Sequence, residues 1–512
     1  MYNCFLKLFY EFKNYILHRL LLPMLLFIFM PVIHAQTSLQ LNWINPLESN
    51  ALFSVKAKSV KTDAAGNIYL AGNFTGTTDF DPSEGIANLT SAGEEDVFLA
   101  KYDVNGKYIY ATVIGGIEYD NCNALAVDRY GNAYITGSFQ DKASFISKKK
   151  TIKKGSADDF DIFIAKYDPD GILLYANSIG GEDRDYGQAI AADDNGNVYV
   201  TGYFSGICDF DLGKGTVNLS SQDGVHLFFA KYDANGEYVY AKNINGNSYG
   251  IANDDKGNIY LTGYYEGTAD FDPGKGVEVM KSIYDENIFF AKYDSYGSFV
   301  FVKNIGSERS KDESKAVALD SENNIYLTGF FEDDADFDPG IGTAILSAPK
   351  PCGMFLAKYT AEGDYIYAKS MSGGRGVIGN AIAVDSTGNA YVTGYFEGTV
   401  DFDPSAETAK LTSPGQTKES TGYEADIFLA KYDTKGNYIY AKSMGGKDYD
   451  KGHCIALTTD GRIYLAGTFD SPANFDPLNN ASFVKLKKAT YGAFLASYSE
   501  CNVNINKIIH TN

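Results

Sequence analysis

Short runs of apolar and aromatic residues alternate with clusters of Asp, Asn and Gly along nearly the whole chain after residue 35. Typical runs lie at 97–102 and 124–128, and the clusters at 103–106 and 128–132 follow them. Runs of this length and period indicate β-strands. The clusters predict hairpin turns, because Gly and Asn accept positive φ and Asp accepts hydrogen bonds from nearby backbone amides. The pattern therefore predicts an all-β chain.

Three phrases recur in a fixed order. Gly-Asn-x-Tyr or a variant starts at residues 66, 131, 196, 257, 323, 388 and 461, a repeat of about 66 residues. Phe-Leu-Ala-Lys-Tyr-Asp or a variant starts at 98, 163, 228, 289, 355, 428 and 494. The third phrase, Tyr-Ile-Tyr-Ala at 108–111, returns near 172, 238, 299, 365 and 438. The apolar run before each Gly-Asn-x-Tyr phrase gives a fourth strand, so every unit supplies four strands, here called a, b, c and d. Strand a is this apolar run, b begins at the Gly-Asn-x-Tyr phrase, c is the Phe-Leu-Ala-Lys-Tyr-Asp phrase and d is the Tyr-Ile-Tyr-Ala phrase.

The missing seventh copy of strand d lies at the start of the chain, where residues 39–44 precede the first Gly-Asn-x-Tyr phrase. A linear solenoid has no need of such a displaced strand, whereas a ring uses it to cover the edges that an open array exposes. The sequence therefore predicts a seven-bladed β-propeller with four strands per blade and extended b-c loops. Its ring is closed by the N-terminal strand, which carries the single tryptophan, Trp43.

Strand a is expected to be innermost, because space narrows toward the axis of a propeller. The position five residues before the repeat Gly (or Asn323) is Ala in six units, and Lys61 takes its place in the first. A lysine there either meets an anion or carboxylate, or is simply solvated. Cys122 and Cys454 lie at nearly the same place in two repeats, and we expect both to be small core residues.

Residues 1–35 have the pattern of a secretory signal peptide, with Lys7, Lys13 and Arg19 before an apolar run at 20–30 and a small residue at Ala35. An uncleaved anchor is the alternative, but the run is short for a spanning helix. We expect a signal peptide at 1–35, a single propeller at 36–499 and a short tail at 500–512. This organisation predicts a secreted or cell-surface protein with no transmembrane segment in the mature chain.

Composition and charge narrow the classes of partner. Hydrophobic residues make up 45% of the chain, enough for a sizeable core despite 52 glycines, which excludes a disordered or collagen-like molecule. The formal net charge of −21 argues against nucleic acid or an anionic membrane as the main partner. Cations, basic surfaces and neutral glycans remain as partners.

The b-c connections carry Asp-Phe-Asp-Pro or a variant of it. Carboxylates in Gly-containing loops suit calcium, and Asp-x-Asp places two of them on one side of an extended segment. The favoured alternative is structural: Phe packs inward, each Asp caps a turn and Pro fixes the bend, since the spacing lacks the distal Glu of an EF-hand. The calcium candidates are Asp79, Asp81, Asp209, Asp211, Asp270, Asp272, Asp336, Asp338, Asp401, Asp403 and Asp476.

Enzymatic activity is not expected. Paired carboxylates can hydrolyse glycosides, but catalysis needs one constellation that breaks the repeat symmetry, and the acids here are spread almost evenly over the units. The sequence has no nucleophile elbow, phosphate loop or HExxH motif. We therefore predict no catalytic residues and no cofactor, with calcium as the alternative, and keep a carbohydrate-active hydrolase or lyase as a further alternative.

The phrases Ala-Val-Asp-x-x-Gly-Asn-x-Tyr, Asp-Phe-Asp-Pro, Phe-Leu-Ala-Lys-Tyr-Asp and Tyr-Ala-Lys-Ser-x-Gly-Gly together resemble the SBBP (seven-bladed β-propeller) repeat family of exported bacterial proteins. The resemblance covers roughly residues 39–499 and implies a propeller on a secreted or surface protein, with no catalytic residues to transfer. We expect a non-catalytic, monomeric module whose acidic face of b-c and d-a loops binds a protein or polysaccharide. A calcium-stabilised scaffold is the alternative.

Overall fold

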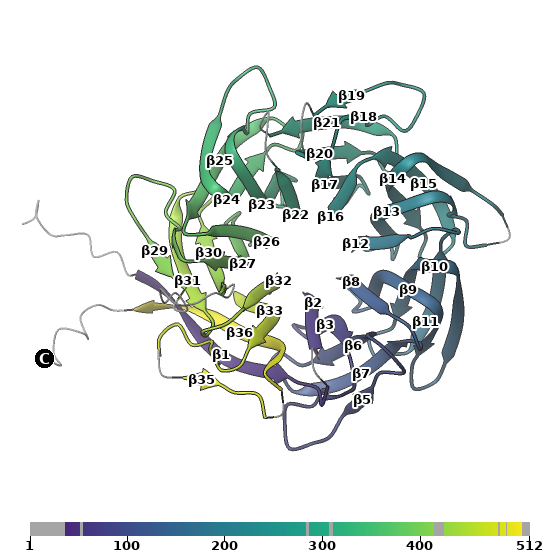
Figure 1. The fold of residues 1–512 in the computed structure, drawn as a ribbon, viewed down its shortest axis with the longest axis horizontal. Helices are drawn as coiled ribbons and strands as arrows, with labels where there is room; N and C mark the ends of the chain where they lie inside the picture. Colours follow the sequence, from purple (N-terminus) through teal and green to yellow (C-terminus); the bar gives the residue numbers. More distant parts are fainter. Residues whose placement is uncertain are drawn as a thin grey trace, which may run out of the picture. The chain divides into compact units, whose positions relative to one another are not determined.

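The computed structural model describes residues 36–51, 55–213, 215–282, 286–306, 311–413, 424–479, 482–487 and 489–503. Residues 39–500 form one compact unit, in which antiparallel sheets are arranged around a central opening (Figure 1). The predicted signal peptide lies outside the described residues. Within the described ranges, no helix is long and apolar enough to cross a membrane.

The sheets are the blades of an all-β propeller, and each strand a pairs with b, b with c, and c with d. In the order a, b, c, d, one blade contains β2 (Val55–Thr62), β3 (Ile68–Phe74), β6 (Asp96–Tyr102) and β7 (Tyr108–Gly115), and the next contains β8 (Asp120–Val127), β9 (Ala133–Ile146), β10 (Thr151–Tyr167) and β11 (Leu173–Ile179). The two blades after these contain β12 (Tyr186–Ala192), β13 (Val198–Asp209), β14 (Asn218–Tyr232) and β15 (Tyr238–Asn245), and then β16 (Asn247–Asn253), β17 (Ile259–Tyr265), β20 (Asn287–Tyr293) and β21 (Phe299–Ile305). They are followed by a blade of β22 (Glu313–Leu319), β23 (Ile325–Asp336), β24 (Ile345–Tyr359) and β25 (Tyr365–Gly373), and by a blade of β26 (Gly376–Val384), β27 (Ala390–Glu397), β30 (Asp426–Tyr432) and β31 (Tyr438–Met444). Short outer ribbons pair β4 (Thr77–Asp79) with β5 (Asn88–Thr90), β18 (Thr268–Asp270) with β19 (Val279–Lys281), β28 (Thr399–Asp401) with β29 (Lys410–Thr412), and β34 (Ala473–Asn474) with β35 (Phe483–Val484).

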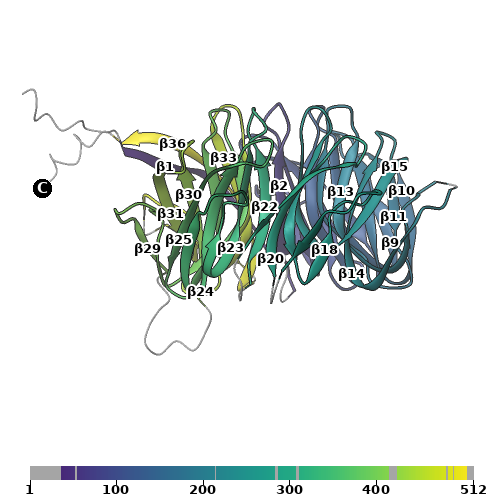
Figure 2. The same cartoon turned by 90° about the horizontal axis from the view of Figure 1, so that it is seen from above.

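The last sheet has the order β1-β36-β33-β32, where β1 is Gln36–Leu47, β32 is Lys451–Leu457, β33 is Arg462–Asp470 and β36 is Tyr491–Val503. The N-terminal strand therefore supplies the outer strand of the C-terminal blade, and β1 and β36 lie side by side in both views (Figure 2). Trp43 packs on Tyr464, with ring centroids 6.0 Å apart. Strand β36 continues past Ser499, after which we had predicted the tail to begin, and Glu500 in this extension forms an ion pair described below.

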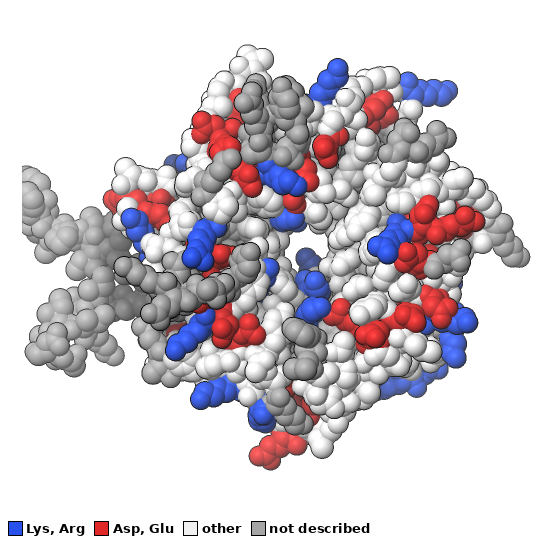
Figure 3. Space-filling view, viewed as in Figure 1, with Lys and Arg blue, Asp and Glu red and all other residues white. Residues whose placement is uncertain are grey.

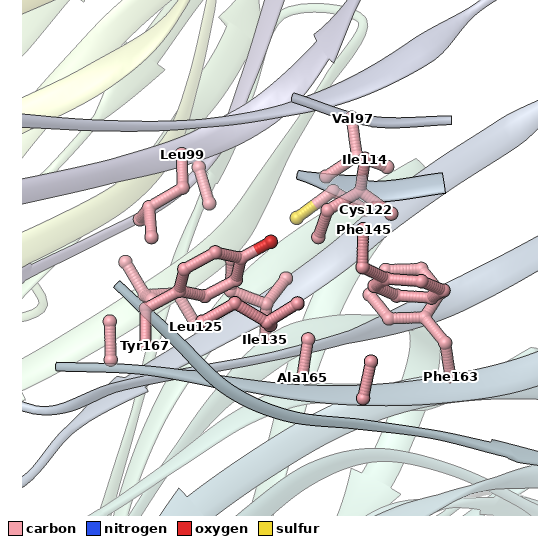
Figure 4. Close-up of a cluster of buried hydrophobic side chains, with 14 of the residues drawn as sticks. Val97, Leu99, Ile114, Cys122, Leu125, Ile135, Phe145, Phe163, Ala165 and Tyr167 are labelled. Atoms are coloured by element: carbon pink, nitrogen blue, oxygen red, sulfur yellow. The ribbon is translucent and has the colours of Figure 1, made fainter. Parts of the chain in front are cut away.

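Hydrophobic cores fill the space between neighbouring blades. In one of them Val97 and Leu99 of the first blade face Phe163 and Ala165 of the second (Figure 4). Cys122 lies in this core and is fully buried. Cys454 is 7% exposed in the core between the last and first blades, so both cysteines are core residues as predicted.

The inner strands line the channel with small side chains, as the alanine column predicted. Ala126, Ala191, Ala252, Ala318, Ala383 and Ala456 line one cavity of about 430 Å³ together with Lys61. Lys61 is exposed to this channel, and the surrounding protein lowers the pKa of its ammonium by desolvation.

The b-c extensions join each blade to the blade before it. The end of strand d bridges the next extension at Gly115–Ser144, Gly180–Asp209, Gly306–Asp336, Gly373–Val400 and Gly445–Asn474. A Cβ on Gly116 would lie 1.9 Å from the Lys142 carbonyl oxygen, and one on Gly374 would lie 2.0 Å from that of Glu397. The recurring Gly-Gly pair is therefore explained by this close approach of two backbones.

On the opposite face, the a-b turns and strand c hold neighbouring blades together. Gly131 has a φ of 83°, and Asn323 takes the same place with a φ of 62°, as the turn prediction required. The strand-c lysines lie 4.6–5.0 Å above the Gly-Asn-x-Tyr tyrosines, and three of them donate to a carbonyl in the next c-d turn. In the last blade, strand c (β36) and strand d (β1) are not joined by such a turn. Lys431 of the preceding blade instead donates to the Glu500 carboxylate at 2.8 Å.

Candidate functional site

A β-bulge interrupts strand a of every blade just before it enters the narrow part of the channel. In β2, Ala57 pairs with Gly72 and Ser59 with Ala71, so that Lys58 between them is left out of the ladder. Bulges redirect a side chain and are frequent next to functional sites. The equivalent bulge residues are Lys58, Asn123, Gln188, Tyr249, Lys315, Asn380 and His453.

All these bulge residues, here called the mouth ring, line one pocket of about 450 Å³. Ile378, Phe330, Tyr395 and Lys451 complete its wall. Because strand b ends and strand a begins here, the pocket opens on the face of the b-c and d-a connections. The redirected side chains of separate blades thus converge on one site.

The mouth ring carries positive charge within a chain of net charge −21. Lys451 lies between Tyr395 and Tyr449, with its Nζ 4.2 and 4.5 Å from the ring centroids, and Lys315 pairs with Glu313. Within the described ranges, no carboxylate lies within ion-pair distance of Lys58; burial and then the charges of Lys56 and Lys451 lower the pKa of Lys58, against an opposing effect of Glu95, which is itself paired with Lys56. Lys and Arg side chains border the central opening (Figure 3).

Several mouth-ring side chains are held by the next blade. Asn123 Nδ2 donates to the Gly187 carbonyl at 2.8 Å, and Asn380 Nδ2 donates to that of Gly452 at 2.9 Å. His453 Nδ1 lies 2.8 Å from the Ala57 carbonyl oxygen; a carbonyl only accepts, so Nδ1 carries the hydrogen. These contacts fix the orientation of the Asn123, Asn380 and His453 side chains.

The surroundings of His453 favour its neutral form at pH 7. Burial and then the charge of Lys58 lower its pKa to about 4. With its hydrogen on Nδ1, the imidazole presents Nε2 as an acceptor. The pocket thus combines ammonium donors, amide groups and one imidazole acceptor.

The predicted calcium candidates lie in the outer b-c turns, where their carboxylates bond to the backbone. Asp270 Oδ1 accepts from the amides of Asp272, at 3.1 Å, and Glu278, at 2.8 Å, while Asp272 Oδ1 accepts from Gly274 at 2.8 Å. The same bonds recur around Asp79, Asp81, Asp209, Asp211, Asp336, Asp338, Asp401 and Asp403. Each motif Phe is fully buried: Phe80, Phe210, Phe271, Phe337, Phe402 and Phe475.

Asn474 stands where the last unit would have its first motif Asp, and its Oδ1 accepts from the Asp476 amide at 2.9 Å. The turn therefore needs an acceptor oxygen and not a charge. Among the described residues, no group of three or more His, Cys, Asp or Glu side chains could hold a metal ion. Calcium binding in these turns stays a prediction.

A pair of variants separates turn capping from calcium binding. Asp270→Asn keeps the Oδ1 acceptor, so we expect a thermal midpoint close to that of the wild type. Asp270→Ala leaves two amides without their acceptor and should cost roughly 1–2 kcal/mol of stability. The thermal midpoints of the wild type and of both variants are measured in EDTA and in calcium. A calcium-dependent midpoint in the wild type that Asp270→Asn reduces would instead support a metal site.

Buried carboxylate pairs recur where blades meet. Asp96 with Asp120, Asp161 with Asp185, and Asp426 with Asp450 are all at most 5% exposed. Burial raises the pKa of Asp96, Asp161, Asp185 and Asp450 to about 7, and that of Asp120 and Asp426 to about 8. The second acid of each pair accepts a backbone amide hydrogen bond from the Gly-Gly segment. These acids lie at the joints between blades, away from the mouth ring, and Asp96 also lines a separate outer cavity of about 640 Å³ beside Gly115 and Gly116.

Sequence reasoning missed the mouth ring. Its members all stand eight residues before the repeat Gly, or Asn323, and this column reads Lys, Asn, Gln, Tyr, Lys, Asn, His. The signal was available in the sequence, because the columns on either side hold only small residues (Ala, Gly, Ser or Cys) while this one changes chemistry from unit to unit. What the pattern alone did not reveal is that a bulge turns this column into the channel.

The model of the SBBP family, described as a beta-propeller repeat, matches residues 109–138 and 175–203. These two segments are SBBP repeats. Each SBBP match runs from strand d through the bulge of strand a into strand b, and the two include Asn123 and Gln188. The resemblance that the repeated phrases indicated is thereby confirmed.

Two curated proteins are similar to the chain. An uncharacterized WD repeat-containing protein of Acanthamoeba polyphaga mimivirus is 25% identical over 86% of this chain and 37% of its own length. The regulatory protein FlaEY of Caulobacter vibrioides is 27% identical over 47% of this chain and 25% of its own length. The chain thus spans well under half of either relative. A crystal structure of a protein of unknown function from Bacteroides caccae is 10% identical, with a TM-score of 0.31 over 68% of this chain and 89% of that one.

Proposed function

We propose that this protein is a non-catalytic, exported, seven-bladed β-propeller that binds a ligand at the mouth ring. One observation carries the proposal: the position that bulges into the mouth pocket changes in size and chemistry from blade to blade, whereas the positions on either side of it hold only small residues (Ala, Gly, Ser or Cys). A purely structural position would be expected to keep residues of one kind, as these neighbouring positions do. Side chains of different chemistry that converge on one pocket instead suit an asymmetric ligand.

The blade count of seven is supported by the repeat. Each Gly-Asn-x-Tyr phrase precedes or begins a strand b, namely β3, β9, β13, β17, β23, β27 or β33. Export is supported by the basic and apolar pattern of residues 1–35. A non-catalytic role is supported by the pocket lining, whose residues include no Asp or Glu, the groups that glycoside hydrolysis by paired carboxylates requires.

Comparison of mouth and rim variants tests where binding occurs. Natively purified, labelled full-length protein is applied to arrays of polysaccharides and envelope proteins. Two double variants are applied alongside it. One carries Lys58→Gln and Gln188→Ala at the mouth, and the other carries Asp272→Lys and Asp338→Lys in the outer b-c turns, here called the acidic rim. We expect the mouth variant to lose at least tenfold in affinity for the partner that the wild type retains, while the rim variant keeps it. The reverse result would assign binding to the acidic rim, as the sequence had suggested, and overturn the proposal.

A further inference from the structure

We infer that the mouth ring binds an acidic sugar, with its carboxylate at Lys58 and its hydroxyls at His453 and the ring amides. This inference rests on the proposed function and gives its site a ligand class. The positive charge of Lys58 has no carboxylate within ion-pair distance in the described part of the chain, and Lys451 lies in the same pocket wall. An anion at this place relieves the repulsion between the two ammonium groups.

A simple inorganic anion uses only part of the site. His453 Nε2 is an acceptor, because Nδ1 donates to Ala57 and the ring is neutral at pH 7. Asn123 and Asn380 each use one amide hydrogen on the next blade, which leaves an amide oxygen as a further acceptor on each. Acceptors require donors on the ligand, and hydroxyl groups supply them.

The walls and the size also fit a sugar acid. Tyr249, Phe330 and Tyr395 line the wall of the pocket with aromatic rings. The pocket volume of about 450 Å³ lies within the usual range for small-molecule sites. Lys315 lies 4.1 Å above the Tyr249 ring and is already paired with Glu313. Lys58 is therefore the lysine best placed to take the carboxylate, and the neutral groups of the ring take the hydroxyls.

The probes are glucuronic acid and a glucuronate-containing disaccharide, with glucose as the neutral analogue and sodium sulfate as the charge-only analogue. Calorimetric titration of the full-length exported protein at low salt should show saturable binding of the glucuronates. We expect binding at least tenfold weaker for glucose and for sulfate, and a loss of affinity as salt rises.

Two mouth variants and one control assign the contacts. Lys58→Gln should weaken glucuronate binding at least tenfold, whereas Lys275→Gln, an equal charge change at an exposed outer turn, should not. His453→Asn keeps a donor for the Ala57 carbonyl, as Asn123 and Asn380 do for the next blade, but removes the Nε2 acceptor. It should weaken glucuronate binding while leaving sulfate binding and the thermal midpoint unchanged.

The outcomes distinguish failure of the sugar-acid inference from failure of the proposed function. If glucuronate does not bind but another ligand from the arrays does, in a manner sensitive to Lys58→Gln, the sugar-acid inference fails and the proposed function stands. If sulfate binds as tightly as glucuronate and competes with it, the mouth is a simple anion site and the inference fails. If no ligand shows sensitivity to mouth variants, both fail.

Discussion

Deletion of residues 36–47 is expected to abolish cooperative folding of the propeller. Without β1, strand β36 becomes an open edge with unpaired backbone groups. Leu39 and Leu47, which are 0% and 1% exposed, leave the cores of the last blade. Trp43 no longer covers Tyr464, and the Asn45 side chain no longer donates to the Gly106 carbonyl of the first blade, a bond of 2.8 Å.

Circular dichroism during heating measures this loss against a chain that starts at residue 36. We expect the shorter chain to lose its sharp transition or to melt far below the control. A synthetic peptide of residues 36–47 added in trans should restore part of the transition, because it can pair with β36. Equal midpoints for the two chains would contradict closure by the N-terminal strand.

Stability is expected to fall as pH rises from 5 to 8, because of the buried carboxylate pairs. Burial raises the pKa of Asp426 from 3.8 to about 8 and that of Asp450 to about 7, so the folded state retains protons that the unfolded state releases. Their favourable effect is complete below pH 4 and is lost as pH rises through 7 and 8. Asp426→Asn removes one buried charge and should raise the unfolding free energy at pH 8 by roughly 1–3 kcal/mol, since each tenfold change in proton affinity corresponds to about 1.4 kcal/mol.

Urea titrations at pH 5 and pH 8 test this prediction. At pH 5 the gain of the Asn variant over the wild type should be smaller than at pH 8, because pH 5 lies closer to the unfolded-state pKa and keeping the proton in the folded state costs less there. Asp364→Asn, the same change of net charge at an exposed c-d turn, serves as the control and should show no such gain at pH 8. A destabilised Asp426→Asn at pH 8 would contradict the prediction and mean that the carboxylate is charged and stabilised in place, by its hydrogen bond from Ser413 Oγ or by a cation.

The repeat made much of the fold predictable. Tyr69, Phe98 and their equivalents recur at fixed spacing, and strand pairing in a meander is local, so that each phrase determines its own strand. Displacement of strand d to residues 39–44 predicted the pairing of β1 with β36. Turn chemistry was equally local, since Gly131 and Asn323 need only their own backbone to adopt positive φ.

The site depended on contacts between blades. The acidic b-c motifs were the most conspicuous chemistry in the sequence, yet in the structure Asp270 and its equivalents cap turns that fasten one blade to the next. Lys58, Asn123 and His453 look unremarkable along the chain, because each stands alone in its own repeat.

The sequence by itself determined the all-β repeat, the order of strands and the closing role of the N-terminal strand, because these follow from periodicity and local turns. Only the tertiary structure decided where chemistry gathers. Bulges that share one column of the repeat point to a common axis, and residues nearly 400 positions apart, such as Lys58 and His453, become neighbours there. Ring closure, which no single repeat encodes, brings their charges and hydrogen-bonding groups into one pocket.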